Sequence, residues 1–180
     1  KDKLARLVPA VERSLKETRN RVQRQVAQVA LQESEARFKA IVSDIPGTVF
    51  QLLLRRDGTQ LFTYVSEGCQ ALFGVKSQIL LRFPGFLFEL IEPEDLPSFR
   101  QAMKISHATL NTWNWEGRVR VSGSRESKWV NLRSSVRQLE DGAIRWDGIV
   151  SNITQSKAAA IEIRRSRERL SELSAHIETV

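Results

Sequence analysis

The chain has few of the residues that form disulfides, membrane spans or reactive sites. Its single cysteine, Cys69, excludes an internal disulfide, which is typical of proteins from a reducing compartment. No apolar run approaches the ~20 residues needed to cross a bilayer, and no signal peptide is visible. We therefore expect a cytoplasmic protein without membrane contact. Because the first residue is Lys1, we also expect a segment of a longer protein.

Motifs for catalysis and metal binding are absent as well. The sequence contains no Gly-rich nucleotide-binding box. No group of His, Cys and Asp residues has the spacing of a metal site. We expect this segment to be non-enzymatic and to bind no metal.

Acidic residues are outnumbered, with 21 Asp and Glu against 28 Lys and Arg, which gives a net charge of +7. The excess is concentrated near the start: residues 1–40 hold 10 basic and 5 acidic residues, whereas residues 41–153 hold 13 and 12. A basic face on a solvated helix explains this distribution without a nucleic-acid groove. We expect no nucleic-acid partner, and a basic helical nucleic-acid binder is the least favoured of the functions considered.

Residues 1–40 contain no glycine and one proline, and this composition favours a long helix. Apolar residues recur every seven positions, at Val8, Leu15, Val22 and Val29. β-Branched residues at one seam position favour a parallel two-stranded coiled coil. We predict an N-terminal signalling helix that pairs two copies of the chain. The alternative is a single amphipathic helix lying on its own domain.

Residues 41–154 alternate between β and helical patterns. Ile45-Pro46-Gly47 ends the first helix, and Asp57-Gly58 separates two β-prone runs, as in a hairpin. Short helical patterns follow, and apolar residues then alternate with polar ones in three further runs, 113–121, 128–139 and 144–154. The sequence therefore predicts an α+β domain with two strands, several short helices and three more strands.

An acidic segment, Glu92-Pro93-Glu94-Asp95, precedes the longest helical pattern inside this domain, residues 96–107. Carboxylates near a helix N-terminus interact favourably with the positive end of the helix dipole. We expect these acidic residues to stabilise the start of that helix.

Residues 155–180 form a second helical pattern with an apolar seam. Ile163, Leu170 and Ile177 recur every seven positions, and Leu173 lies at the other seam position. Burying each Leu or Ile stabilises a structure by ~1.5–3 kcal/mol, so pairing of two copies is favoured. We predict a homodimer through both flanking helices.

A set of short segments occurs in a fixed order along residues 35–157: Glu35–Phe38 with Ile45–Gly47, Tyr64–Ser66 with Leu72–Gly74, Ile91–Asp95, Lys128–Val130, Asp141-Gly142 and Gly148–Thr154. In this order they resemble the PAS domain family, and in particular the type with a C-terminal motif found in bacterial sensor histidine kinases. The resemblance implies a PAS fold, a five-stranded antiparallel sheet with short helices on one face, flanked by long coiled-coil helices. Where the family usually has Asp-Ile-Thr, this chain has Asn152-Ile153-Thr154, which keeps hydrogen bonding but loses an ion pair.

The two ends carry further resemblances. Residues 1–13 resemble the last helix of a response-regulator receiver domain, and residues 169–178 resemble the entry to the dimerisation helices of a histidine kinase. The implied domains are a signalling helix (1–40), a PAS sensor domain (41–154) and a coiled-coil helix leading to a kinase dimerisation domain (155–180). The implied parent is a two-component kinase, with the receiver and kinase domains as partners in the same chain. His176 is not its phosphoacceptor, because Ile177 follows where the motif has an acidic residue.

We expect no cofactor in this PAS domain. His107 falls near the axial-ligand position of haem-binding PAS domains, but its neighbours carry no haem signature. Cys69 lacks the Asn-Cys-Arg-Phe context of flavin-binding relatives, and we expect the four tryptophans to pack on the sheet. Eight apolar residues are candidate walls of a small pocket and are equally candidates for plain core: Phe73, Leu81, Phe86, Leu90, Phe99, Met103, Val119 and Leu132.

The last strand continues almost directly into the C-terminal helix. This favours a non-enzymatic sensor or relay module that passes a conformational bias from the PAS core to that helix. We predict that Asn152, Ile153 and Thr154 form the hinge. The alternative is a receptor whose PAS pocket binds a small molecule or cofactor, and the sequence names neither the stimulus nor the cognate response regulator.

Overall fold

The first unit of the protein is a single long helix. The computed structural model describes residues 2–177, and it describes the side chains of residue 13 and residues 15–170. The chain divides into two units, one ending at Asp44 and one beginning at Ile45. Helix α1 (Asp2–Ser43) makes up the first unit, as its glycine-free composition predicts. Leu15, Val22 and Val29 are all exposed along it.

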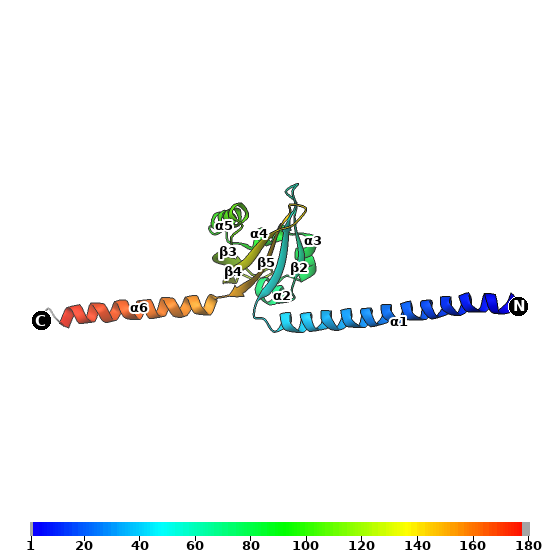
Figure 1. Ribbon diagram of the computed structural model, residues 1–180. Coiled ribbons are helices and arrows are strands. Elements are labelled where there is room, and N and C mark those ends of the chain that lie inside the picture. The colour runs from blue at the N-terminus through cyan, green and yellow to red at the C-terminus, as the bar shows by residue number, and fades with distance from the viewer. Residues whose placement is uncertain (1, 178–180) are drawn as a thin grey trace. The chain divides into compact units, whose positions relative to one another are not determined.

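Five strands form one antiparallel sheet in the second unit, in the order β2-β1-β5-β4-β3 (Figure 1). The first and last strands lie side by side in the middle of the sheet, with Thr48 opposite Val150 and Leu54 opposite Ile144. This confirms the predicted α+β domain with a five-stranded antiparallel sheet. The strands are β1 (Thr48–Leu54), β2 (Gln60–Val65), β3 (Trp113–Arg120), β4 (Ser127–Gln138) and β5 (Ile144–Asn152).

Four short helices connect β2 to β3 and cover one face of the sheet (Figure 1). Gly74 ends the first of them with a φ of +71°, a left-handed conformation that glycine adopts without steric cost. The third of these helices, Phe86–Leu90, was not predicted, because its five residues are too few to show a helical period. The helices are α2 (Gly68–Phe73), α3 (Ser77–Arg82), α4 (Phe86–Leu90) and α5 (Leu96–Thr109).

Alternate residues of the strands point toward these helices and form the core. In β3, Trp113, Trp115 and Val119 are buried, whereas Asn114 and Glu116 are exposed on the opposite face of the sheet. This is the alternation that the sequence predicts for a half-buried strand. The helices contribute the buried residues Leu72, Phe73, Leu80, Phe99 and Met103 to the same core.

Helix α6 (Thr154–Ile177) leaves the sheet with almost no connecting loop. Ile153 is the one residue between β5 and α6. The carbonyl of Ile153 accepts a hydrogen bond from the backbone N–H of Lys157 at 2.9 Å, so the first helical turn closes at once. The start of α6 is therefore tied closely to the end of β5.

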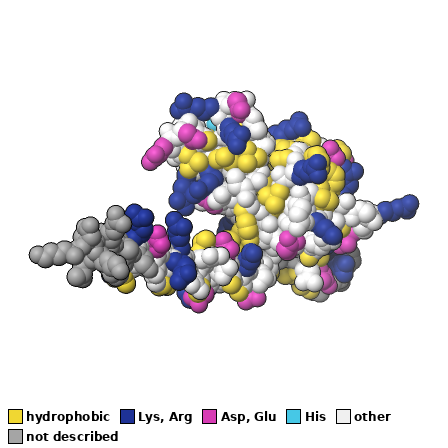
Figure 2. Space-filling view, turned by 90° about the vertical axis from the view of Figure 1, so that its right-hand side faces the viewer, with side chains coloured by type: hydrophobic (Ala, Val, Ile, Leu, Met, Phe, Trp, Pro, Cys, Tyr) yellow, Lys and Arg dark blue, Asp and Glu magenta, His cyan; other side chains and the backbone are white. Residues whose placement is uncertain are grey.

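Charged side chains of both signs lie among one another on one face of the molecule. In the face shown in Figure 2, Lys and Arg side chains alternate with Asp and Glu side chains rather than gathering in one field. Several of them form ion pairs within the second unit, such as Arg145–Asp147 at 3.2 Å. This distribution differs from the single-sign stripe typical of a nucleic-acid footprint.

Candidate functional site

An interior cavity lies between the sheet and the short helices. Its volume is about 30 Å³, and its walls are almost entirely apolar. Pockets for organic ligands usually enclose roughly 300–1,000 Å³, whereas one water takes up about 30 Å³ of the liquid. Aromatic side chains therefore fill most of the space between the layers, among them Phe50, Phe62, Phe73, Phe99 and Trp113.

Phe99 of α5 lies at the centre of this aromatic packing. Its ring makes edge-on contacts with Phe88 at 5.7 Å, Trp113 at 5.0 Å and Trp115 at 4.9 Å between centroids. Such contacts add ~0.5–1.5 kcal/mol each to the gain from burial. Trp146 is also fully buried, so three of the four tryptophans pack into the core as expected.

Two polar groups of residues that line the cavity have no hydrogen-bond partner in the part of the chain that the structure describes. They are the hydroxyl of Thr48 and the indole N–H of Trp113, and both are buried. An unpartnered buried polar group costs ~1–3 kcal/mol. The cavity is therefore a place where the fold gives up some stability.

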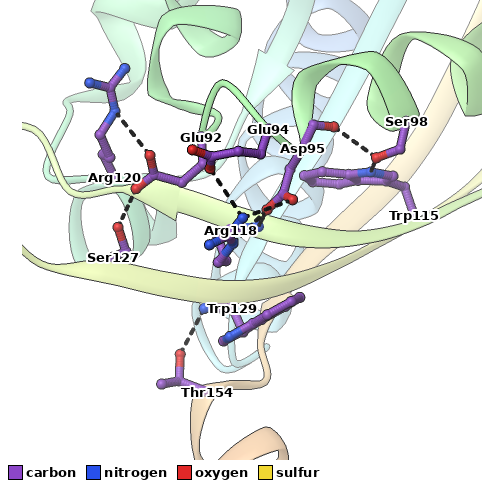
Figure 3. Close-up of polar contacts among 10 residues, drawn as sticks. All are labelled: Glu92, Glu94, Asp95, Ser98, Trp115, Arg118, Arg120, Ser127, Trp129 and Thr154. Atoms are coloured by element: carbon purple, nitrogen blue, oxygen red, sulfur yellow. Dashed lines mark hydrogen bonds and ion pairs between the residues drawn. The ribbon is translucent and has the colours of Figure 1, made fainter.

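A second polar site joins α6 to the sheet (Figure 3). The side-chain oxygen of Asn152 accepts hydrogen bonds from the Thr154 backbone N–H at 3.0 Å and from the Thr154 hydroxyl at 2.7 Å. The Thr154 hydroxyl in turn accepts a hydrogen bond from the backbone N–H of Trp129 in β4 at 3.0 Å. These bonds satisfy N–H groups that the helix start and the strand would otherwise leave free.

Lys157, one turn into α6, adds a charged contact to the same site. Its Nζ atom lies 2.6 Å from Oε2 of Glu116 in β3 and 5.1 Å from the centroid of the Trp129 ring. The Lys157 and Glu116 side chains are 37% and 46% exposed, so water screens the pair and its worth is ~0.2–1 kcal/mol. Asn152 stands where an Asp is usual in the PAS family that the sequence resembles, so this position cannot form an ion pair. The Lys157–Glu116 pair forms one between α6 and β3 instead.

The segment before α5 closes the free edge of β3. The backbone N–H of Glu92 donates to the carbonyl of Arg118 at 3.0 Å, and the Asp95 carboxylate accepts from the backbone N–H of Arg118 at 2.8 Å. Asp95 also accepts from the Arg118 guanidinium, at 2.8 Å from Nε and 3.1 Å from Nη2. Hydrogen bonding to Arg118 lowers the pKa of Asp95 below its ordinary value of 3.8 and raises the pKa of Arg118.

These contacts give the acidic segment a role beyond the expected interaction with the helix dipole. The Asp95 side chain makes no capping hydrogen bond to α5. It turns toward β3 instead, because Arg118 offers a backbone N–H and a guanidinium on the same side. The acidic residue therefore fixes the start of α5 to the sheet edge.

Trp129 connects the edge of β3 with the start of α6. The Arg118 guanidinium lies 5.7 Å from the centroid of the Trp129 ring, and Lys157 contacts the same ring. Cation–π contacts of this kind are worth ~0.5–1 kcal/mol at exposed sites. We call the set Asp95, Arg118, Trp129, Thr154 and Lys157 the Trp129 junction (Figure 3 shows four of its members). It links the first residues of α5 to the first turn of α6.

Comparisons with known proteins agree with this architecture. A family model described as the PAS fold matches residues 62–150. This region is a PAS domain. The fold recognised from the sequence motifs is therefore confirmed.

Solved structures of other PAS-containing proteins have the same fold. The domain is similar to a sensory box histidine kinase/response regulator from Burkholderia thailandensis, with 23% identity over 76% of this chain and 98% of that chain and a TM-score of 0.55. It is also similar to a domain of a putative light and redox sensing histidine kinase from Haloarcula marismortui. The identity is 18% over 66% of this chain and 99% of that chain, and the TM-score is 0.50. A third similar structure is the N-terminal domain of a diguanylate cyclase with a PAS/PAC sensor from Marinobacter aquaeolei. The identity is 13% over 61% of this chain and 98% of that chain, and the TM-score is 0.51. No curated protein matches this sequence closely enough to be counted.

The PAS domain places the eight predicted pocket residues in different positions. Phe73, Phe99 and Leu132 line the interior cavity. Leu81 does not line the cavity. Successive residues of a helix are 100° apart around its axis, so Leu80 points into the core and is 1% exposed, whereas Leu81 is 38% exposed. The other four lie in or against the core, away from the cavity wall: Phe86, Leu90, Met103 and Val119.

The predicted dimer seam is open to solvent wherever its side chains are described. On α1, Leu15, Val22 and Val29 are 65%, 52% and 48% exposed; on α6, Ile163 and Leu170 are 54% and 65% exposed. The side chains of the remaining predicted seam residues, Val8, Leu173 and Ile177, lie outside the described part of the chain, as does His176.

The two residues considered for cofactor chemistry lie apart from each other. Cys69 is fully buried, its thiol donates to the carbonyl of Val75 at 3.1 Å, and burial raises its pKa to about 11. A thiol with so high a pKa stays protonated and unreactive. His107 is exposed on α5, with its ring 6.3 Å from that of Trp146.

Among the described residues, no three His, Cys, Asp or Glu side chains come together as metal ligands. Within that same part of the chain, no helix is both long enough and apolar enough to span a bilayer.

Sequence reasoning singled out Asn152 and Thr154, which are hydrogen-bonded to each other, but missed most of the Trp129 junction. Glu116, Arg118 and Trp129 all occupy outward positions in the strand alternation, which was a usable signal. Their partners were not visible, because Arg118 pairs with Asp95 at a distance of 23 residues and Lys157 pairs with Glu116 at a distance of 41.

Proposed function

We propose that this PAS domain is a non-enzymatic relay that passes a conformational bias between its core and α6 in a dimeric signalling protein. The Trp129 junction carries the proposal. It holds the start of α6 against β4 through Thr154 and against β3 through Lys157, with a single residue, Ile153, between strand and helix. A displacement of the sheet edge therefore moves the first turn of α6.

The strength of these contacts suits a two-state element. Coupling free energies between sites in signalling proteins are typically ~1–3 kcal/mol. The Lys157–Glu116 pair and the Thr154 hydrogen bond are each worth ~1 kcal/mol or less, so a bias of this size redistributes the positions of α6. The same contacts leave the buried PAS core untouched, so the helix can move while the fold persists.

Exposed apolar side chains support pairing of two chains. Leu15, Val29, Ile163 and Leu170 are roughly half or more exposed, and a coiled coil would bury them at its seam. Burying each contributes ~1.5–3 kcal/mol. We propose that α1 and α6 both form coiled coils in a homodimer.

We propose that the parent protein is a cytoplasmic two-component histidine kinase, with a receiver domain before α1 and a kinase domain after α6. Two of the structures with the same fold come from proteins described as histidine kinases, and a third comes from a diguanylate cyclase. In this arrangement α6 continues into the dimerisation helices of the kinase, and α1 receives the signal from the receiver.

We further propose that the PAS core works without haem or flavin and binds neither nucleic acid nor membrane. The interior cavity of about 30 Å³ and the position of His107 on an exposed face of α5 support the first point. The mixed surface charge supports the second (Figure 2).

Sedimentation equilibrium of the purified chain tests the dimer that the relay requires. We expect a dimer at micromolar concentration, and we expect Ile163→Asp to shift it strongly toward monomer because the change places a charge in the seam. Ile161→Asp is a matched control, since Ile161 is equally exposed (52% against 54%) but lies off the seam. A monomeric wild-type chain, or equal effects of the two substitutions, would contradict the proposal.

A further inference from the structure

A surface groove runs between α5 and the ends of β1 and β2, and it shares no residue with the Trp129 junction. The groove is largely open to solvent, and its volume is about 410 Å³. Organic ligands usually occupy pockets of roughly 300–1,000 Å³, so this α5 groove has the size that the interior cavity lacks.

The rim of the α5 groove is basic. Arg100, Lys104 and His107 lie at positions i, i+4 and i+7 of α5, which places them on one face of the helix, and all three are exposed. No acidic residue lines the groove. Neither Arg100 nor Lys104 forms an ion pair with any side chain that the structure describes, in contrast to Arg118 and Lys157.

The floor of the α5 groove is apolar and held in place. Trp146 is fully buried, and its indole N–H donates to the hydroxyl of Ser106 at 3.0 Å. Met103 is 8% exposed, and the Phe88 ring is fixed by its edge-on contact with Phe99. The groove thus combines a rigid apolar floor with two unpaired cations within one helical turn.

We propose that the α5 groove binds a small organic anion with a flat apolar body. A carboxylate or phosphate group lies between Arg100 and Lys104, and the body of the ligand packs on Met103 and Phe88 beside the His107 ring. An anion neutralises two cations that have no ion-pair partner among the described side chains, and the apolar body covers the part of Phe88 that stays exposed beside the nearly buried Met103. A neutral ligand of the same shape gains the second contribution only.

Occupation of this groove gives the relay an input. The rim residues lie on α5, whose start is fixed by Asp95 to Arg118 and so to the Trp129 junction. A ligand that clamps α5 against the β1–β2 end therefore acts on the same helix that the junction holds. This signalling step rests on the proposed relay, whereas binding itself does not.

Two matched probes test the binding step on the whole 180-residue chain. We would titrate it with 2-naphthoate and with the neutral 2-naphthamide, and follow heat by calorimetry and the His107 ring protons by NMR. We expect 2-naphthoate to bind with a shift of the His107 signals, and 2-naphthamide to bind at least about tenfold more weakly because it lacks the charge.

Two double variants with the same change in net charge locate the site. Arg100→Gln with Lys104→Gln should weaken 2-naphthoate binding at least about tenfold, whereas Lys76→Gln with Arg125→Gln, both exposed and remote from the groove, should change it less than about twofold. All four residues are exposed, so both variants should fold.

Several outcomes would overturn the inference. They are equal affinity for the two probes, equal loss in the two double variants, and 2-naphthoate binding that leaves the His107 signals unmoved. Failure of 2-naphthoate to bind would also overturn it, and if an acidic peptide then bound in an Arg100-dependent manner, the groove would be a polypeptide docking surface instead. Normal 2-naphthoate binding by a chain that sediments as a monomer would remove the relay and leave the binding site standing.

Discussion

Replacing Asp95 by Asn isolates the contact that fixes α5 to the sheet. The Asp95 carboxylate accepts three hydrogen bonds from Arg118, at 2.8, 2.8 and 3.1 Å, and its side chain is only 20% exposed. Asn keeps an acceptor for the backbone N–H but loses the charge that the guanidinium requires. Hydrogen bonds to charged groups contribute ~1.5–3 kcal/mol, and water around the 37% exposed Arg118 side chain reduces this. We therefore expect Asp95→Asn to lower the free energy of unfolding by ~1–2 kcal/mol.

The same contact has a signature in pH. Because the pKa of Asp95 is lowered in the folded state, its contribution is fully present above the unfolded value of 3.8 and is lost as pH falls through the folded value. The difference in unfolding free energy between wild type and Asp95→Asn should therefore be constant near neutral pH. It should shrink as the pH falls below 3.8.

Urea unfolding followed by tryptophan fluorescence measures both effects. Glu94→Gln is the matched control, since Glu94 also faces Arg118, at 3.2 Å, but is 73% exposed; we expect it to cost less than ~0.5 kcal/mol. If Asp95→Asn and Glu94→Gln cost the same, or if the difference between wild type and Asp95→Asn is unchanged at acidic pH, the reasoning about the sheet edge is refuted.

Two further changes test other parts of the structure. A double-mutant cycle of Glu116→Gln and Lys157→Met in urea unfolding should give a coupling energy of ~0.3–1 kcal/mol between the two side chains. Amide hydrogens in the first turn of α6 should exchange faster in these variants than in the wild type. A coupling energy of zero would show that the ion pair does not hold α6. Gly148→Ala should destabilise by ~1–3 kcal/mol, because the new Cβ would lie 2.5 Å from the Ser134 Cβ and 2.6 Å from a backbone oxygen. Gly85→Ala has open space and should be nearly neutral; equal midpoints would contradict this packing.

The strands of the sheet were predictable because each carries its own signal. Trp113, Trp115 and Val119 alternate with polar residues, and this period of two specifies both the strand and its buried face. The turn at Asp57-Gly58 likewise predicts the pairing of β1 with β2. Local pattern does not, however, specify the pairing of β1 with β5, which brings together residues 90 to 102 positions apart in the chain, from Leu54 with Ile144 to Thr48 with Val150.

The candidate sites were less predictable for the same physical reason. Asn152 and Thr154 interact two residues apart, so a local pattern was enough to single them out, and their role as a hinge stays a prediction. The contacts of Asp95 and Lys157 depend on how the sheet edge and α6 come together in space, and the dipole argument for the acidic segment, which considers only the local helix, does not predict that Asp95 pairs with Arg118. Leu80 and Leu81 are neighbours in the sequence, and only the packing of α3 on the sheet decides which of them is buried.

The central claim is that the PAS sheet holds α6 and thereby sets the geometry of a paired helix. Spin-label distances between the two copies of the chain test this most directly, with a nitroxide at position 167 in an Arg167→Cys, Cys69→Ser background. We predict one narrow distance distribution for the intact junction. A variant that also carries Glu116→Gln and Thr154→Ala should give a broader or shifted one while remaining dimeric. Identical distributions in the two dimers would contradict the account.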